Sequence, residues 1–150
     1  MSTSCKNRYL VINGHAENAE EAICLCANAL NAAGIVGSEF GAKCCLRERE
    51  YPTGLPTAIP VAIPHSKDDG ITENAICLLR LDKPVTFYRM DDDEEKIATN
   101  LVFNLAVKNP NEHLAVLQSL MTFLNDAAEI ENCLEMPESA LIDYLGKKIG

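Results

Sequence analysis

The stretch from residue 51 to residue 64 constrains the fold more than any other part of this chain, because four of its residues are prolines. The prolines are Pro52, Pro56, Pro60 and Pro64. Proline fixes the backbone φ angle and lacks the amide hydrogen that a helix interior requires. We therefore expect a stiff loop that leads into a short strand at residues 61–63. Pro64 should end this strand and leave His65 at its junction with the next loop.

His65 is a candidate catalytic residue because of this position. A loop gives access to substrate while the adjoining strand fixes the side chain, and a neutral imidazole can accept a phosphoryl group directly. The backbone amides after His65, the Thr53 hydroxyl and an arginine are available to stabilise the transferred group. On these residues alone, an ordinary turn histidine is an equally good interpretation of His65.

Strand-like and helix-like patterns alternate along the rest of the chain. Strands are expected at residues 8–12, 75–81, 85–88 and 99–107, and helices at 18–34, 38–50, 109–124 and 138–145. The Lys83-Pro84 pair should form a turn between two of these strands. The alternation predicts the α/β fold class, as a single three-layer α/β/α domain over residues 1–150 with a mixed β-sheet flanked by helices.

Two of the expected helices carry N-terminal signals. Asn18 with Glu21, and Asn109 with Glu112, have the spacing of capping boxes. The apolar stripe expected to face the core from the second of these helices is Leu114, Leu117, Met121 and Leu124. His113 then falls in the first turn, where the positive end of the helix attracts phosphate. The alternative interpretation of His113 is a capping or solvated side chain.

Charge and cysteine content exclude several functions. A formal net charge of −9 opposes binding to nucleic acid and favours a protein partner with a basic face. The seven cysteines accompany no secretory signal or membrane span, so we expect reduced thiols in a cytoplasmic protein without direct membrane insertion. The cysteine pairs at 24/26 and 44/45 lack zinc spacing, so no metal site is expected. The acidic run at 91–95 is interpreted as a solvated loop.

Common cofactor and hydrolase motifs are absent from the sequence. It contains no glycine-rich phosphate loop, no dinucleotide fingerprint, no serine-hydrolase elbow and no zinc-hydrolase helix motif. We therefore expect no cofactor. The chemistry that remains is that of a histidine acting as a nucleophile.

Three short motifs, taken in order, resemble the IIA component of the bacterial sugar phosphotransferase system (PTS), mannitol/fructose class or type 2. They are Leu46-Arg47-Glu48, Pro52-Thr53-Gly54 and Val61-Ala62-Ile63-Pro64-His65. The similarity continues through residues 90–93 and 109–124, so it covers nearly the whole chain. The loop from Gly54 to His65 is longer than in mannitol and fructose members and contains prolines. In this respect the chain is similar to galactitol-type IIA proteins.

The resemblance implies a phosphotransferase that works through a phosphohistidine. His65 would accept the phosphoryl group from the phosphocarrier HPr and pass it to a cysteine of a IIB component. The IIB component would in turn serve the IIC membrane permease, for uptake and phosphorylation of a sugar or alditol, with galactitol expected. The alternatives are a regulatory, nitrogen-related IIA module that uses the same histidine, and a binding module with no turnover.

The resemblance also implies roles for individual residues. Arg47 matches the family arginine, and His113 matches a second histidine that lies beside the phosphorylated one. Arg49 competes with Arg47, because counting back from His65 favours Arg49 whereas counting back from Thr53-Gly54 favours Arg47. Thr53 and Ser66 are expected to stabilise the phosphoryl group.

Overall fold

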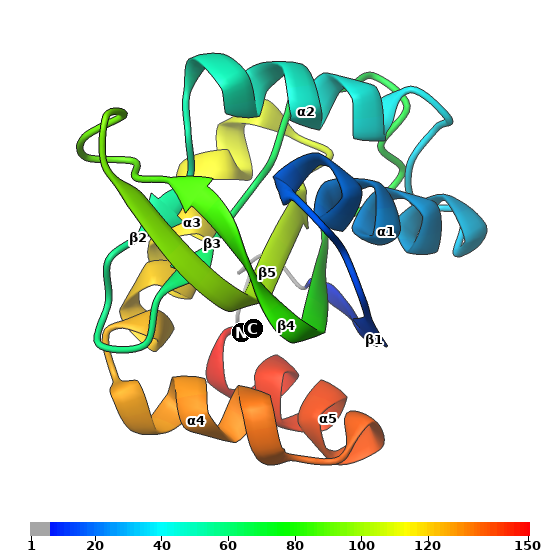
Figure 1. Ribbon diagram of the computed structural model, residues 1–150. Helices are drawn as coiled ribbons and strands as arrows, with labels where there is room; N and C mark the ends of the chain where they lie inside the picture. The colour runs from blue at the N-terminus through cyan, green and yellow to red at the C-terminus, as the bar shows by residue number, and fades with distance from the viewer. Residues whose placement is uncertain (1–6) are drawn as a thin grey trace.

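A five-stranded mixed sheet lies between two layers of helices in the computed structural model, which describes residues 7–150 (Figure 1). The strands are β1 (Arg8–Gly14), β2 (Gly54–Leu55), β3 (Val61–Ala62), β4 (Ala75–Tyr88) and β5 (Lys96–Ala106). The helices are α1 (Ala19–Ala32), α2 (Phe40–Glu50), α3 (His113–Leu124), α4 (Ala127–Glu135) and α5 (Glu138–Lys148), with a 3-10 turn, η1 (Pro110–Glu112). Residues Met1 to Lys6, on which the expectation of no secretory signal partly rests, lie outside the described residues.

The two faces of the sheet each carry a hydrophobic core. Helices α1 and α2 cover one face and pack on side chains such as Cys77 and Val102, while α3, α4 and α5 cover the other face around Ile76 and Phe103 (Figure 1). Neighbouring strand residues point to opposite faces, which is why Ile76 and Cys77 belong to different cores. The predicted three-layer α/β/α fold with a mixed sheet is confirmed.

Strand order places β3 beside the central strand of the sheet, β5. The order is β1-β4-β5-β3-β2, with β1 parallel to β4 and β3 parallel to β5, whereas β4 and β5 are antiparallel. After β3 the chain continues alongside β5, so His65 forms an isolated bridge with Leu105. The backbone amide of Leu105 donates to the carbonyl of Pro64 at 3.0 Å. The predicted strand before Pro64 is therefore present and anchored to a central strand.

The predicted turn at Lys83-Pro84 is wrong, because β4 runs without a break from Ala75 to Tyr88. The register between β4 and β5 shifts between Arg80 and Val85, and the pairing of β1 with β4 ends at Leu81. Pro84 therefore lies where no ladder hydrogen bond requires an amide donor. A proline that looks like a turn in the sequence is here accommodated by a bulge.

Helix α3 is rotated relative to the predicted stripe. Its buried residues are Val116, Leu120, Phe123 and Leu124, so Leu124 was predicted correctly. Leu117 and Met121 are half-buried and pack against the same core, whereas Leu114 is 63% exposed. The face that meets the core runs through positions 116, 120 and 123, because packing of the helix on the sheet, and not the apolar pattern alone, sets its rotation. The predicted capping box at Asn109 is also wrong in part. The Asn109 side chain accepts from the amide of Asn111, but the Glu112 carboxylate accepts from the Asn74 side chain at 3.0 Å.

Local capping signals elsewhere agree with the structure. The Asn18 side chain accepts from the amide of Glu21 at 2.9 Å and begins α1, as predicted. Helix α4 was not predicted, although Asp126 caps it by accepting from the amide of Ala128 at 3.0 Å. The signal was present in the sequence. Asp126 is a preferred capping residue, and it precedes Ile130 and Cys133, which are three residues apart and therefore share one helix face.

Gly54 is expected to tolerate no side chain. A Cβ atom at this position would lie 2.5 Å from the carbonyl oxygen of Tyr88 and 2.9 Å from Ile97 Cγ1. We predict that Gly54→Ala lowers the free energy of unfolding by about 2 kcal/mol, because backbone must move to relieve the overlap. Gly146 of α5 is the matched control, since nothing lies within 4 Å of its Cβ position. Gly146→Ala should raise stability by about 1 kcal/mol. Urea unfolding curves check both values, and equal effects would contradict the steric argument.

Candidate active site

A cavity of about 810 Å³ brings His65, Arg47, Thr53 and His113 together. Its wall combines the end of α2 and the loop after it, the third residue after β3, the turn between β4 and β5, and the start of α3. These segments are far apart in the sequence. Four of the six residues predicted to form the site therefore line one cavity, and the other two, Arg49 and Ser66, do not.

The imidazole of His65 is buried and held by one backbone hydrogen bond. Only 6% of the residue is exposed, and Nδ1 lies 2.8 Å from the carbonyl oxygen of Ile63. A carbonyl can only accept, so Nδ1 carries the hydrogen and Nε2 keeps its lone pair. Burial lowers the pKa of His65 to about 4, against the opposing hydrogen bond to Ile63, and the nearby His113 and Arg47 lower it further. His65 is therefore neutral at cellular pH, with Nε2 free to act as a nucleophile.

His113 lies directly beside His65. The two ring centroids are 4.9 Å apart, with the ring planes tilted by 53°. Burial lowers the pKa of His113 as well, and the positive charges of Arg47 and Lys67 act in the same direction. The neighbouring ring is thus a neutral donor within reach of a group attached to His65.

Arg47 and Arg49 point away from each other, because residues two apart in a helix lie on different faces. Arg47 lines the cavity, with its Cζ atom 5.2 Å from the centre of the Tyr51 ring. Its Nε atom is buried and has no hydrogen-bond partner. Arg49 lies on the other side of α2 and binds the carboxylate of Glu20 at 2.8 and 2.9 Å. Of these two arginines, only Arg47 lines the cavity beside His65.

Glu48 holds the loop that contains Thr53, a role that its place in the Leu46-Arg47-Glu48 motif did not indicate. Its carboxylate accepts from the Thr53 amide at 2.7 Å and from the Thr53 hydroxyl at 2.9 Å. Burial raises the pKa of Glu48 to about 7, although the two bonds from Thr53 and the charge of Arg47 act against this rise. The Thr53 hydroxyl hydrogen is thus directed at Glu48 and not at the cavity.

Ser66 lies outside the cavity around His65. Its hydroxyl donates to the carbonyl of Lys67 at 3.3 Å, and the side chain lines a smaller neighbouring cavity, which His113 also borders. The expected phosphate-stabilising role of Ser66 therefore has no direct geometric support, although the backbone that follows His65 remains near the ring.

Asn104 is a further buried residue that sequence reasoning missed. Its Nδ2 atom donates to the carbonyl of Pro64 at 2.9 Å, the same carbonyl that accepts from the amide of Leu105. Two donors from β5 thus fix the peptide that precedes His65. No pattern near His65 could reveal this contact, because Asn104 is about forty residues away in the sequence.

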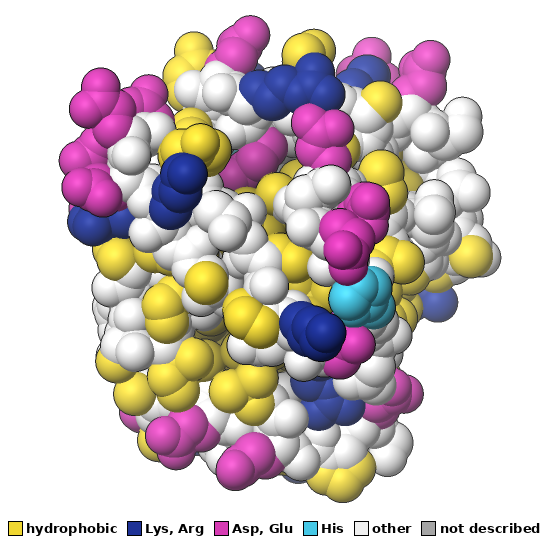
Figure 2. Space-filling view, viewed as in Figure 1, with side chains coloured by type: hydrophobic (Ala, Val, Ile, Leu, Met, Phe, Trp, Pro, Cys, Tyr) yellow, Lys and Arg dark blue, Asp and Glu magenta, His cyan; other side chains and the backbone are white. Residues whose placement is uncertain are grey.

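The acidic run at residues 91–95 is exposed, as expected of a solvated loop, and its acidic side chains gather at the turn between β4 and β5 (Figure 2). Asp91, Asp92 and Asp93 also line the cavity beside His65. Asp91 forms an ion pair with Arg89 at 2.6 Å. Within residues 7–150, no group of three or more histidine, cysteine or acidic side chains is arranged to hold a metal ion.

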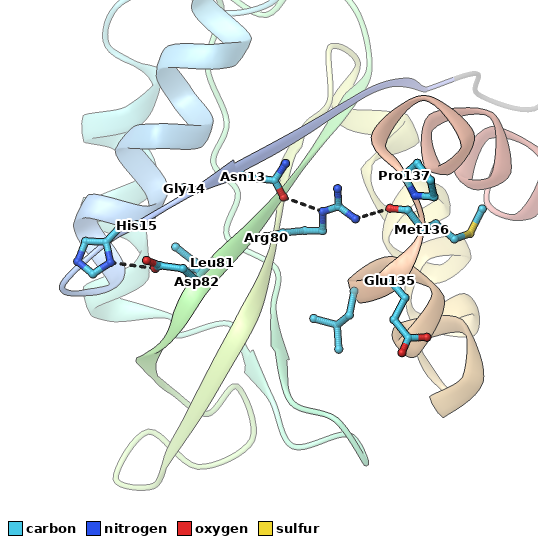
Figure 3. A pocket seen from close by; sticks show the side chains of 10 residues that line it. Asn13, Gly14, His15, Arg80, Leu81, Asp82, Glu135, Met136 and Pro137 are labelled. Atoms are coloured by element: carbon cyan, nitrogen blue, oxygen red, sulfur yellow. Dashed lines mark hydrogen bonds and ion pairs between the residues drawn. The ribbon is translucent and has the colours of Figure 1, made fainter.

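A second cavity lies where β1 ends beside the middle of β4 (Figure 3). Three of its polar side chains, Asn13, Arg80 and His15, already have hydrogen-bond partners. Arg80 donates to the Asn13 side chain at 2.9 Å and to the backbone of Met136, and His15 is hydrogen-bonded to Asp82 at 2.9 Å. In the pairing of β1 with β4, Gly14 lies opposite Leu81. His65 instead forms its bridge with Leu105, which pairs with Ile76 near the start of β4, so the two cavities are well separated along the sheet. We therefore take the cavity around His65 as the candidate active site.

Burial of His65 should make the protein less stable in mild acid. The unfolded chain binds a proton at this position below about pH 6.5, whereas the folded chain does so only below about pH 4. Stability from His65 is therefore present above pH 6.5 and lost as the pH falls toward 4. We predict that wild type loses about 3 kcal/mol more than His65→Gln over this range. Urea unfolding at several pH values measures the difference.

The comparison with His65→Gln removes an opposing effect. The pKa of Glu48 is raised to about 7, so protonation of Glu48 stabilises the folded state as the pH falls from 7 to 4.5. This contribution is present in both proteins and cancels in the difference. Identical pH profiles for the two proteins would contradict a depressed pKa of His65.

Among the helices within residues 7–150, none has the length and apolar character needed to span a membrane.

Comparisons with known proteins agree on one family. The family model described as "Phosphoenolpyruvate-dependent sugar phosphotransferase system, EIIA 2" matches residues 3–147. The PTS system galactitol-specific EIIA component of Escherichia coli K12 is 32% identical over 123 residues, which are 81% of each chain.

Solved structures agree with this match. One belongs to the complex of enzyme IIAMTL and phosphorylated enzyme IIBMTL from Escherichia coli, with a TM-score of 0.74 and 26% identity over 91% of this chain and 93% of that chain. The nitrogen regulatory protein IIA-Ntr of Neisseria meningitidis has a TM-score of 0.70 and 21% identity over 95% of this chain and 93% of that chain. At that identity, the second likeness shows the fold alone.

Proposed function

Because the family model spans residues 3–147, this chain belongs to the EIIA type 2 family of the phosphoenolpyruvate-dependent sugar phosphotransferase system, and we propose that His65 carries its phosphoryl group. Members of this family are sugar-specific IIA components and act as phosphotransferases. The observation that carries the proposal is the buried, neutral ring of His65, whose Nδ1 binds the carbonyl of Ile63. We take residues 1–150 as one phosphotransfer domain.

The proposed reaction is a pair of in-line transfers. The Nε2 lone pair of His65 attacks the phosphorus of phosphorylated HPr, so that one N–P bond forms as the N–P bond to HPr breaks. No proton has to leave His65, because Nδ1 keeps its hydrogen and donates it to the Ile63 carbonyl throughout. A cysteine thiolate of the IIB component then attacks the same phosphorus, which forms an S–P bond and returns His65 to its neutral state.

Arg47 and His113 are proposed to stabilise the phosphoryl group during both transfers. The buried Nε–H of Arg47 has no partner, so it can donate to a phosphoryl oxygen without giving up an existing bond. The ring of His113, with its centroid 4.9 Å from that of His65, supplies a second donor. Such fixed donors stabilise charge that develops on the transferred group. Thr53 contributes through Glu48, which holds its loop in place.

The proposed partners follow the phosphoryl group. HPr is the donor and a IIB component is the acceptor. The chain acts in the cytoplasm, and through IIB it serves a IIC membrane permease. The solved complex of a similar IIA with its phosphorylated IIB supports such a partner. Identity of 32% to a galactitol-specific component supports galactitol as the transported alditol. No comparable observation favours the regulatory, nitrogen-related role, since that likeness extends to the fold only.

Phosphoryl relay in a purified system tests the proposal. The chain is incubated with phosphoenolpyruvate, enzyme I and HPr, and then with a galactitol-type or a mannitol-type IIB component. Intact-mass analysis should show an acid-labile gain of one phosphoryl group on the chain. That group should then move to galactitol-type IIB at least about tenfold faster than to mannitol-type IIB. Absence of the mass gain would overturn the proposal. A phosphoryl group that stays on the chain in the presence of each of the two IIB components would exclude the transport role.

A further inference from the structure

Helices α1 and α2 pack side by side on one face of the sheet, in antiparallel register (Figure 1). At one point they approach closely, because a Cβ atom on Gly41 would lie 2.9 Å from the Cβ atom of Ala27. Two turns further along α2, Arg49 binds Glu20 of α1 at 2.8 Å. Positions 41, 45 and 49 lie along one stripe of α2, and positions 27, 24 and 20 lie along the facing stripe of α1. Cys45 lies midway between Gly41 and Arg49, and Cys24 lies between Ala27 and Glu20, so these two contacts place Cys45 opposite Cys24.

Contacts of Cys45 agree with this register. Its sulfur lies 3.8 Å from the carbonyl oxygen of Glu20, which is one turn before Cys24 in α1. Burial raises the pKa of Cys45 to about 11, and the neighbouring Cys24 thiol contributes to the rise. Cys24 is exposed whereas Cys45 is only 7% exposed, and both are free thiols. One thiol is thus at the surface and its neighbour lies directly beneath it.

We propose that Cys24 and Cys45 form an oxidation-sensitive dithiol, which a small-molecule disulfide such as glutathione disulfide converts into a covalent link between α1 and α2. The Cys24 thiolate attacks the small disulfide, which forms a mixed disulfide and releases one small thiolate. Cys45 then loses its proton to solvent and attacks the Cys24 sulfur, which releases the second small thiol. Two protein thiols are oxidised and one small disulfide is reduced, so the electrons balance.

The pair differs from the other cysteines that the structure describes. Cys26, Cys44, Cys77 and Cys133 are fully buried. A buried thiol without access to solvent does not react with an external disulfide. Cys24 is therefore the entry point, and Cys45 is the partner that its position supplies. The link would restrain α2 two residues before Arg47 and three before Glu48, which both contribute to the candidate site.

Treatment of the folded, full-length chain with glutathione disulfide tests the pair, with peptide mapping after alkylation of the remaining thiols. Wild type should yield a peptide linked through Cys24 and Cys45 and retain no glutathione on either of these two cysteines. Cys45→Ser should retain one glutathione on Cys24, because no second thiol resolves it. In Cys24→Ser, Cys45 should react at least about tenfold more slowly than Cys24 does in wild type, since Cys45 is buried. Cys5→Ser is a control that should behave as wild type.

Thermal unfolding of the oxidised protein supplies a second readout. A link that fits the native register closes a loop of about 22 residues in the unfolded chain, so the Tm should rise by roughly 5 °C or more. A lower Tm would mean that the helices must move apart, and this would overturn the proposal. Stable glutathione on Cys24 of wild type, or a link between Cys24 and Cys5, would also overturn it. These readouts do not use phosphotransfer, so they stand or fall separately from the proposed function.

Discussion

Replacing His65 by alanine is expected to abolish phosphoryl acceptance by this chain. The variant loses the only ring whose Nδ1 is fixed on the Ile63 carbonyl and whose Nε2 is thereby kept unprotonated in the cavity. We expect the initial rate with phosphorylated HPr to fall by at least about 10⁴-fold, because a side chain without a nucleophile cannot form the intermediate. Intact-mass measurements taken over time, under conditions that preserve acid-labile phosphate, give this rate directly.

His15→Ala is the matched control for His65→Ala. His15 is exposed, is hydrogen-bonded to Asp82 and lies in the second cavity at the far end of β1. Its loss should leave the rate of phosphorylation unchanged within about twofold, since an exposed ion pair contributes little to stability. Far-ultraviolet circular dichroism of all variants would show that the fold is kept. An acid-labile phosphoryl group that persists on folded His65→Ala would refute the assignment of His65.

Removal of the Arg47 guanidinium is expected to have the second largest effect. Arg47 has a buried Nε–H without a partner beside His65, so it can donate to the transferred group in the transition state. We expect Arg47→Ala to lower the rate of phosphorylation by about 10²-fold, the usual effect of losing one fixed donor. Arg47→Lys should recover only part of this loss, because it keeps the charge but loses the planar fork.

Arg49→Ala is the matched control, two residues away in the same helix. Arg49 binds Glu20 at the surface, with side chains that are 62% and 51% exposed. The loss of such an exposed pair should change the rate by less than about twofold. Initial rates at equal concentrations of phosphorylated HPr compare the two variants. A larger effect for Arg49→Ala than for Arg47→Ala would reverse the assignment of the arginine.

Some features were predictable from the sequence because their causes are local. Pro64 ends a strand through its own ring and missing amide, so the position of His65 at a strand end follows from adjacent residues. Asn18 caps α1 through a bond to the amide three residues later. The alternation of strands and helices likewise depends on neighbouring side chains, and it predicted the three-layer fold. The short motifs around Arg47, Thr53 and His65 then indicated the family.

Other features depend on contacts between distant segments, and the sequence alone could not decide them. Counting along the chain favoured Arg47 but left Arg49 as a competitor, and the packing of α2 on Glu20 of α1 separates them. Pro84 continues a strand because its missing donor falls in a bulge opposite β5. Asn104 fixes the Pro64 carbonyl from about forty residues away. Backbone geometry and capping act within a few residues, whereas helix phase, register and burial are set by whatever the folded chain packs against them.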